Sequence, residues 1–281
     1  MTGSGPLLQP RLFDRDGVRY RITLPTWGQW LAMLDRSARG APDAGTADVM
    51  GLLQLWLAGS VDVMEGETAK PLGPIDALPA VLADALVAEG SAALETLAQT
   101  LDIQTEHGAL NDGVQITCAL GTYHLTPLSF GERNACLSRN IGLRDGAPEI
   151  DASAYEVALV AASITAPEGL RAMDLMALPL PLGEALVTAA RALSDAAPDA
   201  ELAAFAQAGV PHPDLELANL CLAFGLSPQE AMDLPAATAR RLNAAANLIH
   251  ASQPVQQTDA TPTLHTAPED DRVTRIVVHD D

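Results

Sequence analysis

Apolar and polar residues alternate near the start of the chain in the way that a β-hairpin requires. Val18, Tyr20 and Ile22 are separated by polar residues, which predicts a strand with one apolar face. Residues 11–13, which contain the apolar pair Leu12-Phe13, form a second short strand before it. The Asp-Gly pair at 16–17 between the two runs is typical of a two-residue hairpin turn. We therefore predict a hairpin over residues 11–23.

Directly after this hairpin, the spacing of apolar residues changes from that of a strand to that of a helix. Thr26 and Gln29 have the spacing of a capping box, so Thr26 is the expected helix start. Cations near residues 36–39 and the glycine at position 40 are typical of a helix end. The predicted apolar stripe consists of Trp27, Trp30, Leu31 and Leu34.

The same succession occurs again about one hundred residues later. Residues 20–29 read Tyr-Arg-Ile-Thr-Leu-Pro-Thr-Trp-Gly-Gln, and residues 123–132 read Tyr-His-Leu-Thr-Pro-Leu-Ser-Phe-Gly-Glu. Residues 114–126 alternate as a hairpin with a turn expected at Gly121-Thr122, and Ser129 with Glu132 repeats the capping box. A second match, residues 77–87 with 177–187, follows in the same order. The chain therefore reads as a tandem duplication of one hairpin-plus-helices module.

Further helices are expected after each capped helix. Residues 47–58 and 152–163 are apolar on most faces, which is typical of buried helices. Helices are also expected to begin at three Leu-Pro pairs, where proline is tolerated in the first turn, and over 214–224; the pairs are Leu78-Pro79, Leu178-Pro179 and Leu234-Pro235. Ser227 with Glu230 is a third capping signature. The glycine-, proline- and polar-rich segments 64–75 and 103–113 are interpreted as loops.

The predicted fold class is mostly α with small β-hairpins (α+β). Its predicted parts are a first module over 8–110, a second over 113–210, C-terminal helices over 211–251 and a flexible tail over 252–281. We expect the two hairpins to pair into one small sheet, because isolated hairpins leave their edges open.

Composition narrows the classes of partner. The net charge is −20, with 36 acidic and 16 basic residues, and Lys70 is the sole lysine. This balance disfavours nucleic acid and anionic membrane surfaces, which attract clustered cations. The three cysteines are scattered and the chain has no apolar run of about 20 residues. We expect a cytoplasmic protein whose partners are proteins.

No motif for catalysis, cofactor binding or metal binding occurs in the chain. The six histidines have no metal-ligand spacing, and neither a glycine-rich nucleotide loop nor a nucleophile elbow is present. Ser129 to Glu132 resembles part of a site, but its match with residues 26–29 identifies it as a helix start. We expect no enzyme, no cofactor, no catalytic residue and no metal site.

Two sets of residues are candidates for partner binding. Trp27, Trp30 and Phe130 lie on helical stripes where core packing is the ordinary role, but as exposed anchors they would dominate an interface. At the C-terminus, residues 272–278 favour a strand that could add to a partner's sheet, or else form a frayed end. The residues of that candidate strand are Arg272, Ile276 and Val278.

Residues 125–134 carry a resemblance to a known class of proteins. A Thr-bearing hairpin, a capped helix and Ala/Leu-rich helices, together with residues 222–236, resemble accessory proteins from phage-tail loci. These include tail assembly chaperones and baseplate-hub assembly proteins of contractile injection systems. The resemblance implies a non-enzymatic assembly factor or structural accessory that acts by protein-protein binding. The alternatives are an acidic adaptor or inhibitor that binds a basic protein, and an enzyme of unrecognised type.

Overall fold

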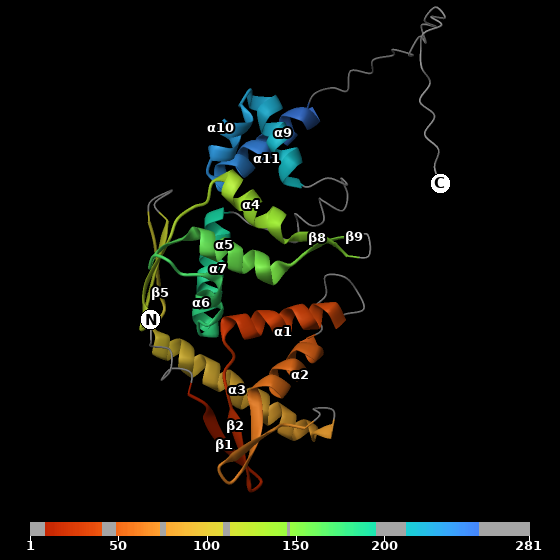
Figure 1. Ribbon diagram of the computed structural model, residues 1–281, viewed down its shortest axis with the longest axis vertical. Helices are drawn as coiled ribbons and strands as arrows, with labels where there is room; N and C mark the ends of the chain where they lie inside the picture. Colours follow the sequence, from red (N-terminus) through yellow and green to blue (C-terminus); the bar gives the residue numbers. More distant parts are fainter. Residues whose placement is uncertain are drawn as a thin grey trace, which may run out of the picture.

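The computed structural model describes residues 9–40, 49–73, 77–108, 113–144, 147–194 and 212–252. These residues form three units that follow one another along the long axis of the molecule (Figure 1). The first unit has its own sheet and lies at one end, and a cluster of three helices lies at the other. The fold is mostly helical with small antiparallel sheets, which confirms the predicted α+β class.

The first unit begins with the predicted hairpin. β1 (Arg11–Arg15) pairs with β2 (Val18–Ile22), and the turn holds Asp16 at φ 52° and Gly17 at φ 79°. Two positive φ values are what an Asp-Gly hairpin turn supplies. The unit continues with α1 (Trp27–Gly40), α2 (Val49–Ser60), β3 (Val61–Glu65), β4 (Thr68–Pro71) and α3 (Ala80–Leu101).

The second unit also contains the predicted hairpin, but its turn differs. Cys118 pairs with Gly121, so Ala119 and Leu120 form the turn and the expected turn at Gly121-Thr122 is wrong. Gly121 opens the returning strand at φ 134°, a value that suits glycine. The unit consists of β5 (Gln104–His107), β6 (Val114–Cys118), β7 (Gly121–Leu125), α4 (Phe130–Asn140), β8 (Ile141–Arg144), β9 (Ala147–Ile150), α5 (Ala152–Ser163), β10 (Ile164–Ala166), α6 (Ala172–Met176) and α7 (Leu180–Ser194).

The third unit is helical. It consists of α9 (His212–Phe224), α10 (Pro228–Asp233) and α11 (Ala236–Ser252). Gly225, at φ 67°, ends α9, and the Ser227–Glu230 capping box starts α10, as the sequence predicts.

The duplication inferred from the sequence extends to the element boundaries. The Thr23 N–H donates to the Ser60 carbonyl at 2.7 Å, and the Thr126 N–H donates to the Ser163 carbonyl at 2.9 Å, so the same bond recurs at equivalent positions. Corresponding elements begin 103 residues apart in the two units: Arg11 and Val114, Val18 and Gly121, Trp27 and Phe130, Val49 and Ala152, Val61 and Ile164.

The hairpins do not pair with each other, so that expectation is wrong. They belong to two separate four-stranded sheets, ordered β1-β2-β3-β4 and β10-β7-β6-β5. The second strand of each hairpin pairs with the strand that follows the apolar helix: β2 pairs with β3, and β7 pairs with β10. The fourth strand lies at opposite edges of the two sheets, with β4 beside β3 and β5 beside β6. These fourth strands, β4 and β5, lie in the segments 64–75 and 103–113 that were interpreted as loops. In the second sheet both hairpin strands therefore gain a neighbour within the unit, whereas β1 stays at the edge of the first sheet.

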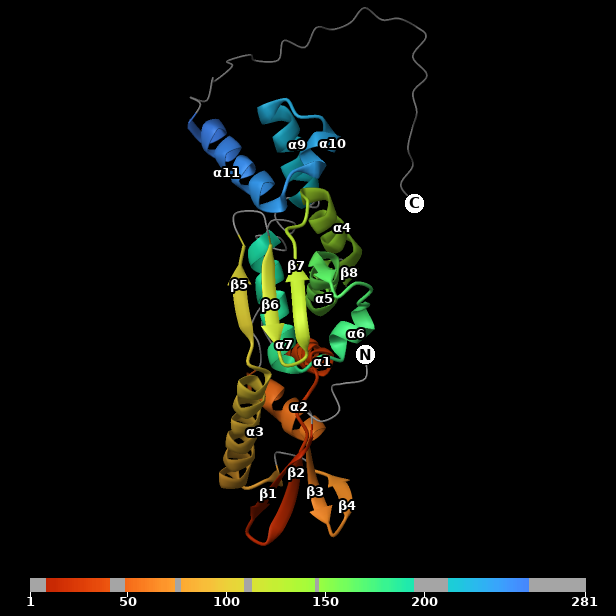
Figure 2. The same cartoon turned by 90° about the vertical axis from the view of Figure 1, so that its left-hand side faces the viewer.

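Two of the hydrophobic clusters meet along α3. Leu86, in the first half of α3, packs in the first unit with Trp56, whereas Leu97 and Leu101 belong to the larger core. That larger core also contains Trp27 of the first unit and much of the second unit. α3 runs from beside the first sheet to the start of β5 (Figure 2). The first two units therefore share a core across the boundary expected near residue 110.

Candidate protein-docking site

The two equivalent helices begin with the same set of hydrogen bonds. In α1 the Gln29 N–H donates to the Thr26 hydroxyl at 3.3 Å, and the Thr26 N–H donates to the Gln29 Oε1 at 2.9 Å. In α4 the Glu132 N–H donates to the Ser129 hydroxyl at 3.2 Å, and the Ser129 N–H donates to the Glu132 Oε2 at 2.8 Å. Both predicted capping boxes are therefore confirmed.

Each capped turn docks on a Leu-Pro segment that comes later in the chain. The Trp27 N–H donates to the Leu178 carbonyl at 2.8 Å, and the Phe130 N–H donates to the Leu234 carbonyl at 2.7 Å. An N–H in the first helical turn has no partner within its own helix, so a carbonyl from another segment satisfies it. We name the two contacts the first joint (residues 26–29 on 178–179) and the second joint (residues 129–132 on 234–235).

A glycine in each capped turn allows the close approach. A Cβ on Gly28 would lie 2.6 Å from the Met176 Cβ, and a Cβ on Gly131 would lie 3.0 Å from the Met232 Cε. One residue separates the methionine from the Leu-Pro pair in both cases. The aromatic-glycine pair is therefore the contact surface of each capped turn.

The aromatic side chains fill the space behind these turns. Trp27 is 0% exposed and lies on Gly183 of α7, where an added Cβ would overlap the indole ring. Phe130 is also 0% exposed and belongs to one buried cluster with Ala239 of α11 and Leu220 of α9. A small residue therefore stands four positions after the proline in both joints, where it leaves room for the aromatic ring.

Glu184 lies beside the first joint on α7. Partial burial raises the pKa of its carboxyl group, and the nearby Trp27 indole lowers that pKa by a smaller amount. The indole nitrogen makes no hydrogen bond of normal geometry, so its interaction with Glu184 is a weak one. The side chain as a whole remains exposed, so solvent screens the effect of this shift on stability.

The second joint contains a buried ion pair. Arg133 Nη2 lies 3.3 Å from Glu216 Oε2 of α9, with the two side chains 1% and 9% exposed. The guanidinium carbon lies 5.8 Å from the centroid of the Phe130 ring, within the range of a cation–π contact. The second joint thus combines apolar packing with charge pairing between α4 and α9.

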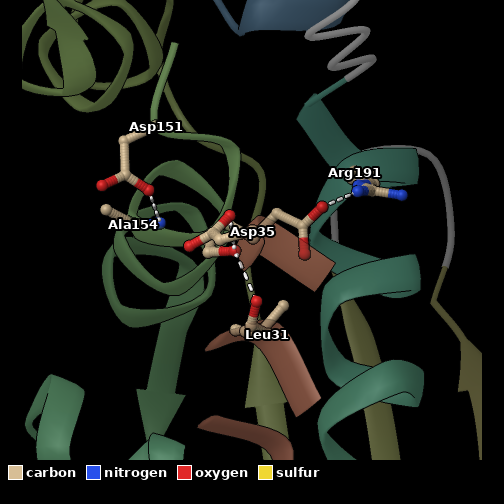
Figure 3. Close-up of polar contacts among 7 residues, drawn as sticks. Leu31, Asp35, Asp151, Ala154 and Arg191 are labelled. Atoms are coloured by element: carbon tan, nitrogen blue, oxygen red, sulfur yellow. Dashed lines mark hydrogen bonds and ion pairs between the residues drawn. The ribbon is translucent and has the colours of Figure 1, made fainter. Parts of the chain in front are cut away.

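Polar contacts tie the first two units together at α5, as Figure 3 shows. The Ser153 hydroxyl lies 2.7 Å from Asp35 Oδ1 and 3.3 Å from the Leu31 carbonyl, both on α1. Three residues further along α5, Glu156 pairs with Arg191 of α7. The first joint is therefore reinforced by contacts from α1 through α5 to α7.

The structure corrects the predicted partner-binding residues of the two helices. Trp27 and Phe130 are fully buried within the chain, so they are not exposed anchors in this fold. Trp30 is half-buried and packs against two of the hydrophobic clusters. The physical reason is that docking on the Leu-Pro segments removes both aromatic rings from solvent. The tail candidates Arg272, Ile276 and Val278 lie outside the described residues.

One polar pocket of about 380 Å³ lies at an end of the second sheet. Its lining includes Glu106, His107 and His124, all of which are exposed. Glu106, Gln115 and His124 are cross-strand neighbours on adjacent strands. Exposed side chains of this kind lack the desolvation that adapts an acid or base to catalysis.

Groups of metal ligands and membrane-spanning helices are two further features relevant to the site. Within the described ranges, no three histidine, cysteine, aspartate or glutamate residues are grouped as metal ligands would be. Nor does any helix there combine the length and apolar character needed to cross a bilayer.

Sequence reasoning identified the capped turns but not what they contact. It interpreted the three Leu-Pro pairs only as helix starts. Met-x-Leu-Pro at 176–179 and again at 232–235 was a signal that could have pointed to a repeated contact. Comparison of the chain with protein-family models, curated proteins and solved structures gives no match.

Proposed function

We propose that this chain is a non-enzymatic, protein-binding assembly factor or structural accessory of a phage-tail-like (contractile injection) particle. The observation that carries the proposal is the repeated joint, in which a capped aromatic-glycine turn docks on a Leu-Pro segment. A chain that stacks its own units through one repeated contact has surfaces suited to stacking against other proteins. The resemblance of residues 125–134 to tail accessory proteins is the reason for proposing a phage-tail-like particle as the assembly in which the chain acts.

Exposed apolar side chains in the first and third units support binding to proteins. Leu222 on α9 is 83% exposed and Leu248 on α11 is 73% exposed, at the end formed by the third unit. Val81 on α3, in the first unit, is 66% exposed. α9 is apolar on most faces, and such a helix is usually covered on more than one side.

A second candidate function is that of an acidic adaptor or inhibitor of a basic protein. The net charge of −20 favours it, because complementary charge accelerates association and selects partners. On this alternative, binding depends strongly on ionic strength, since exposed charges are screened at physiological salt. Apolar docking at the ends of the stack depends on salt far less.

The proposal is tested in the native host by deleting the gene and examining tail-like particles by electron microscopy. The proposal expects fewer complete particles, with recovery when the full chain is supplied again. A control strain carries Arg19→Ala, which removes only an exposed ion pair and is expected to behave as wild type. Normal particle numbers in the deletion strain would contradict the proposal.

A further inference from the structure

Three Leu-Pro pairs directly precede the first turn of a helix, at 78–79, 178–179 and 234–235, but capped turns dock on only two of them in the described residues. Leu178–Pro179 and Leu234–Pro235 accept the turns that begin α1 and α4. We propose that the remaining segment, Leu78–Pro79 at the start of α3, binds the capped first turn of a helix from a partner protein. This inference rests on the protein-binding part of the proposed function and not on the identity of the particle.

The residues that follow the three prolines correspond in type. A small residue stands four positions after each proline, and a leucine stands seven positions after it. In the first joint the small residue adjoins the aromatic ring, and in the second joint it lies in the same buried cluster as the ring. The equivalent sets are Ala83 and Leu86, Gly183 and Leu186, and Ala239 and Leu242.

Burial differs between the occupied segments and the remaining one. The residue after the proline is 7% exposed at Leu180 and 0% exposed at Ala236, whereas Ala80 is exposed. The small residue is buried at Gly183 and Ala239 but only half-buried at Ala83. The positions that a capped turn covers in the two joints are therefore more accessible at the start of α3.

The backbone acceptor is also available at this segment. The carbonyls of Leu178 and Leu234 each accept an N–H from a capped turn. Within the part of the chain that the structure describes, no backbone N–H outside regular elements donates to the Leu78 carbonyl. A capped turn would supply such a donor, because its first N–H groups lack partners in their own helix.

The charge of α3 indicates what charge the bound helix should carry. α3 has no lysine or arginine, Glu89 is paired with Arg11 of β1, and Asp84 and Glu95 remain exposed, so this surface favours a helix with cationic side chains. The two internal examples also carry arginine in their helices. We therefore identify the occupant as a helix that begins with a Ser/Thr cap, an aromatic residue, glycine and Gln/Glu, and that bears a net positive charge. A second copy of this chain is not the occupant, because its own aromatic rings at both capped turns are buried.

The chain itself supplies the probe for a test. A fluorescent peptide of residues 23–40, titrated with the full-length protein, should bind and increase in anisotropy. Replacing Trp27 by alanine in the peptide, or Ala83 by tryptophan in the protein, should weaken binding at least about tenfold, since a buried aromatic dominates such contacts. Ala88→Trp, at an exposed position of the same helix, is the matched control and should bind as wild type.

The place of binding is tested separately. A peptide with a photoreactive benzophenone at position 27 should crosslink within residues 78–86 of the protein. Crosslinks within 176–187 would mean displacement of α1 from the first joint and would overturn the inference. Equal binding of the wild-type and Trp27→Ala peptides would also overturn the inference.

If Ala83→Trp does not fold, Val81→Asp at a 66% exposed position replaces it, with the same expected loss of peptide binding.

Self-association is the remaining alternative. Sedimentation of the wild-type protein and of the Ala83→Trp variant should show the same oligomeric state for both. An oligomer that this variant dissociates would identify a second copy as the occupant and overturn the inference. The peptide result does not depend on particle assembly, so its failure is distinguishable from failure of the proposed function.

Discussion

Arg133 of α4 and Glu216 of α9 form a buried ion pair across the second joint, 3.3 Å apart. The pair connects the second unit to the helical third unit, and Arg133 also lies beside the Phe130 ring. Removing one partner of such a pair leaves an uncompensated charge in the protein interior. This contact explains how a charged side chain is accommodated beside the apolar cluster of the second joint.

We expect Arg133→Met to lower the free energy of unfolding by about 3 kcal/mol, because Glu216 then keeps its charge without this partner. The double variant Arg133→Met with Glu216→Leu should recover most of the loss, since apolar side chains then replace both charges. Urea denaturation of the wild-type, single and double variants measures the difference. The exposed Asp14–Arg19 pair is the control, and Arg19→Ala should leave the free energy of unfolding nearly unchanged. A double variant as unstable as the single one would contradict this account.

The first joint predicts opposite effects of the same substitution at two helical glycines. Gly183→Ala places a Cβ where the Trp27 indole lies, so we expect a loss of about 1–3 kcal/mol from overpacking. At Gly59 the nearest side-chain atom would be 3.5 Å away, an ordinary contact. Gly59→Ala should therefore stabilise the protein by up to about 1 kcal/mol through helix propensity. Thermal unfolding followed by circular dichroism compares the two, and stabilisation by Gly183→Ala would contradict the described packing of Trp27.

Local sequence patterns predict the hairpins, the capped helices and the buried helices because each depends on neighbouring residues. The turn at Asp16-Gly17 and the caps at Thr26 and Ser129 are examples in which side-chain chemistry determines backbone geometry directly. The duplication strengthened those predictions, because both copies had to satisfy the same physical requirements. Features that depend on residues a few positions apart were therefore predicted correctly, except for the turn of the second hairpin, which lies at Ala119 and Leu120.

The joints and the fourth strands could not be predicted in this way. β4 and β5 are short edge strands rich in polar residues, so their periodicity does not separate them from loops. Contact between Trp27 and Leu178 joins segments far apart in the chain, and nothing near Trp27 indicates which segment receives it. The expectation of exposed aromatic anchors failed for the same reason, because it lacked the partner that buries them.

Cys136 should be unreactive in the folded protein. Burial raises the pKa of its thiol, and Glu132 raises it further, while Arg139 lowers it by less than burial raises it. The thiolate is the reactive form, so a raised pKa and a buried sulfur both slow alkylation. We expect iodoacetamide at pH 8 to modify the half-buried Cys221 first and Cys136 only after unfolding, as mass spectrometry of digested samples would show. Rapid modification of Cys136 in folded protein would contradict its placement.

Two carboxyl groups should change acid stability in opposite directions. Hydrogen bonds from the Ser227 hydroxyl and backbone N–H lower the pKa of Glu230 below its ordinary value of 4.5. A lowered pKa in the folded state means that Glu230 contributes stability above pH 4.5 and loses it as the pH falls through the folded pKa. Glu230→Gln should therefore be less stable than wild type at neutral pH, and the difference should disappear at low pH.

Glu184 provides the opposite sign. Burial raises its pKa, so the folded state binds this proton more tightly, and the wild-type protein gains stability from the group as the pH falls through the raised pKa to below 4.5. Glu184→Gln should lack that gain while being as stable as wild type, or slightly more stable, at neutral pH, because the exposed side chain is screened by solvent. Unfolding by urea at a series of pH values from neutral to 3 compares both variants with wild type. Parallel curves for the two variants would show that the capping bond at Glu230 and the burial beside Trp27 do not act as described.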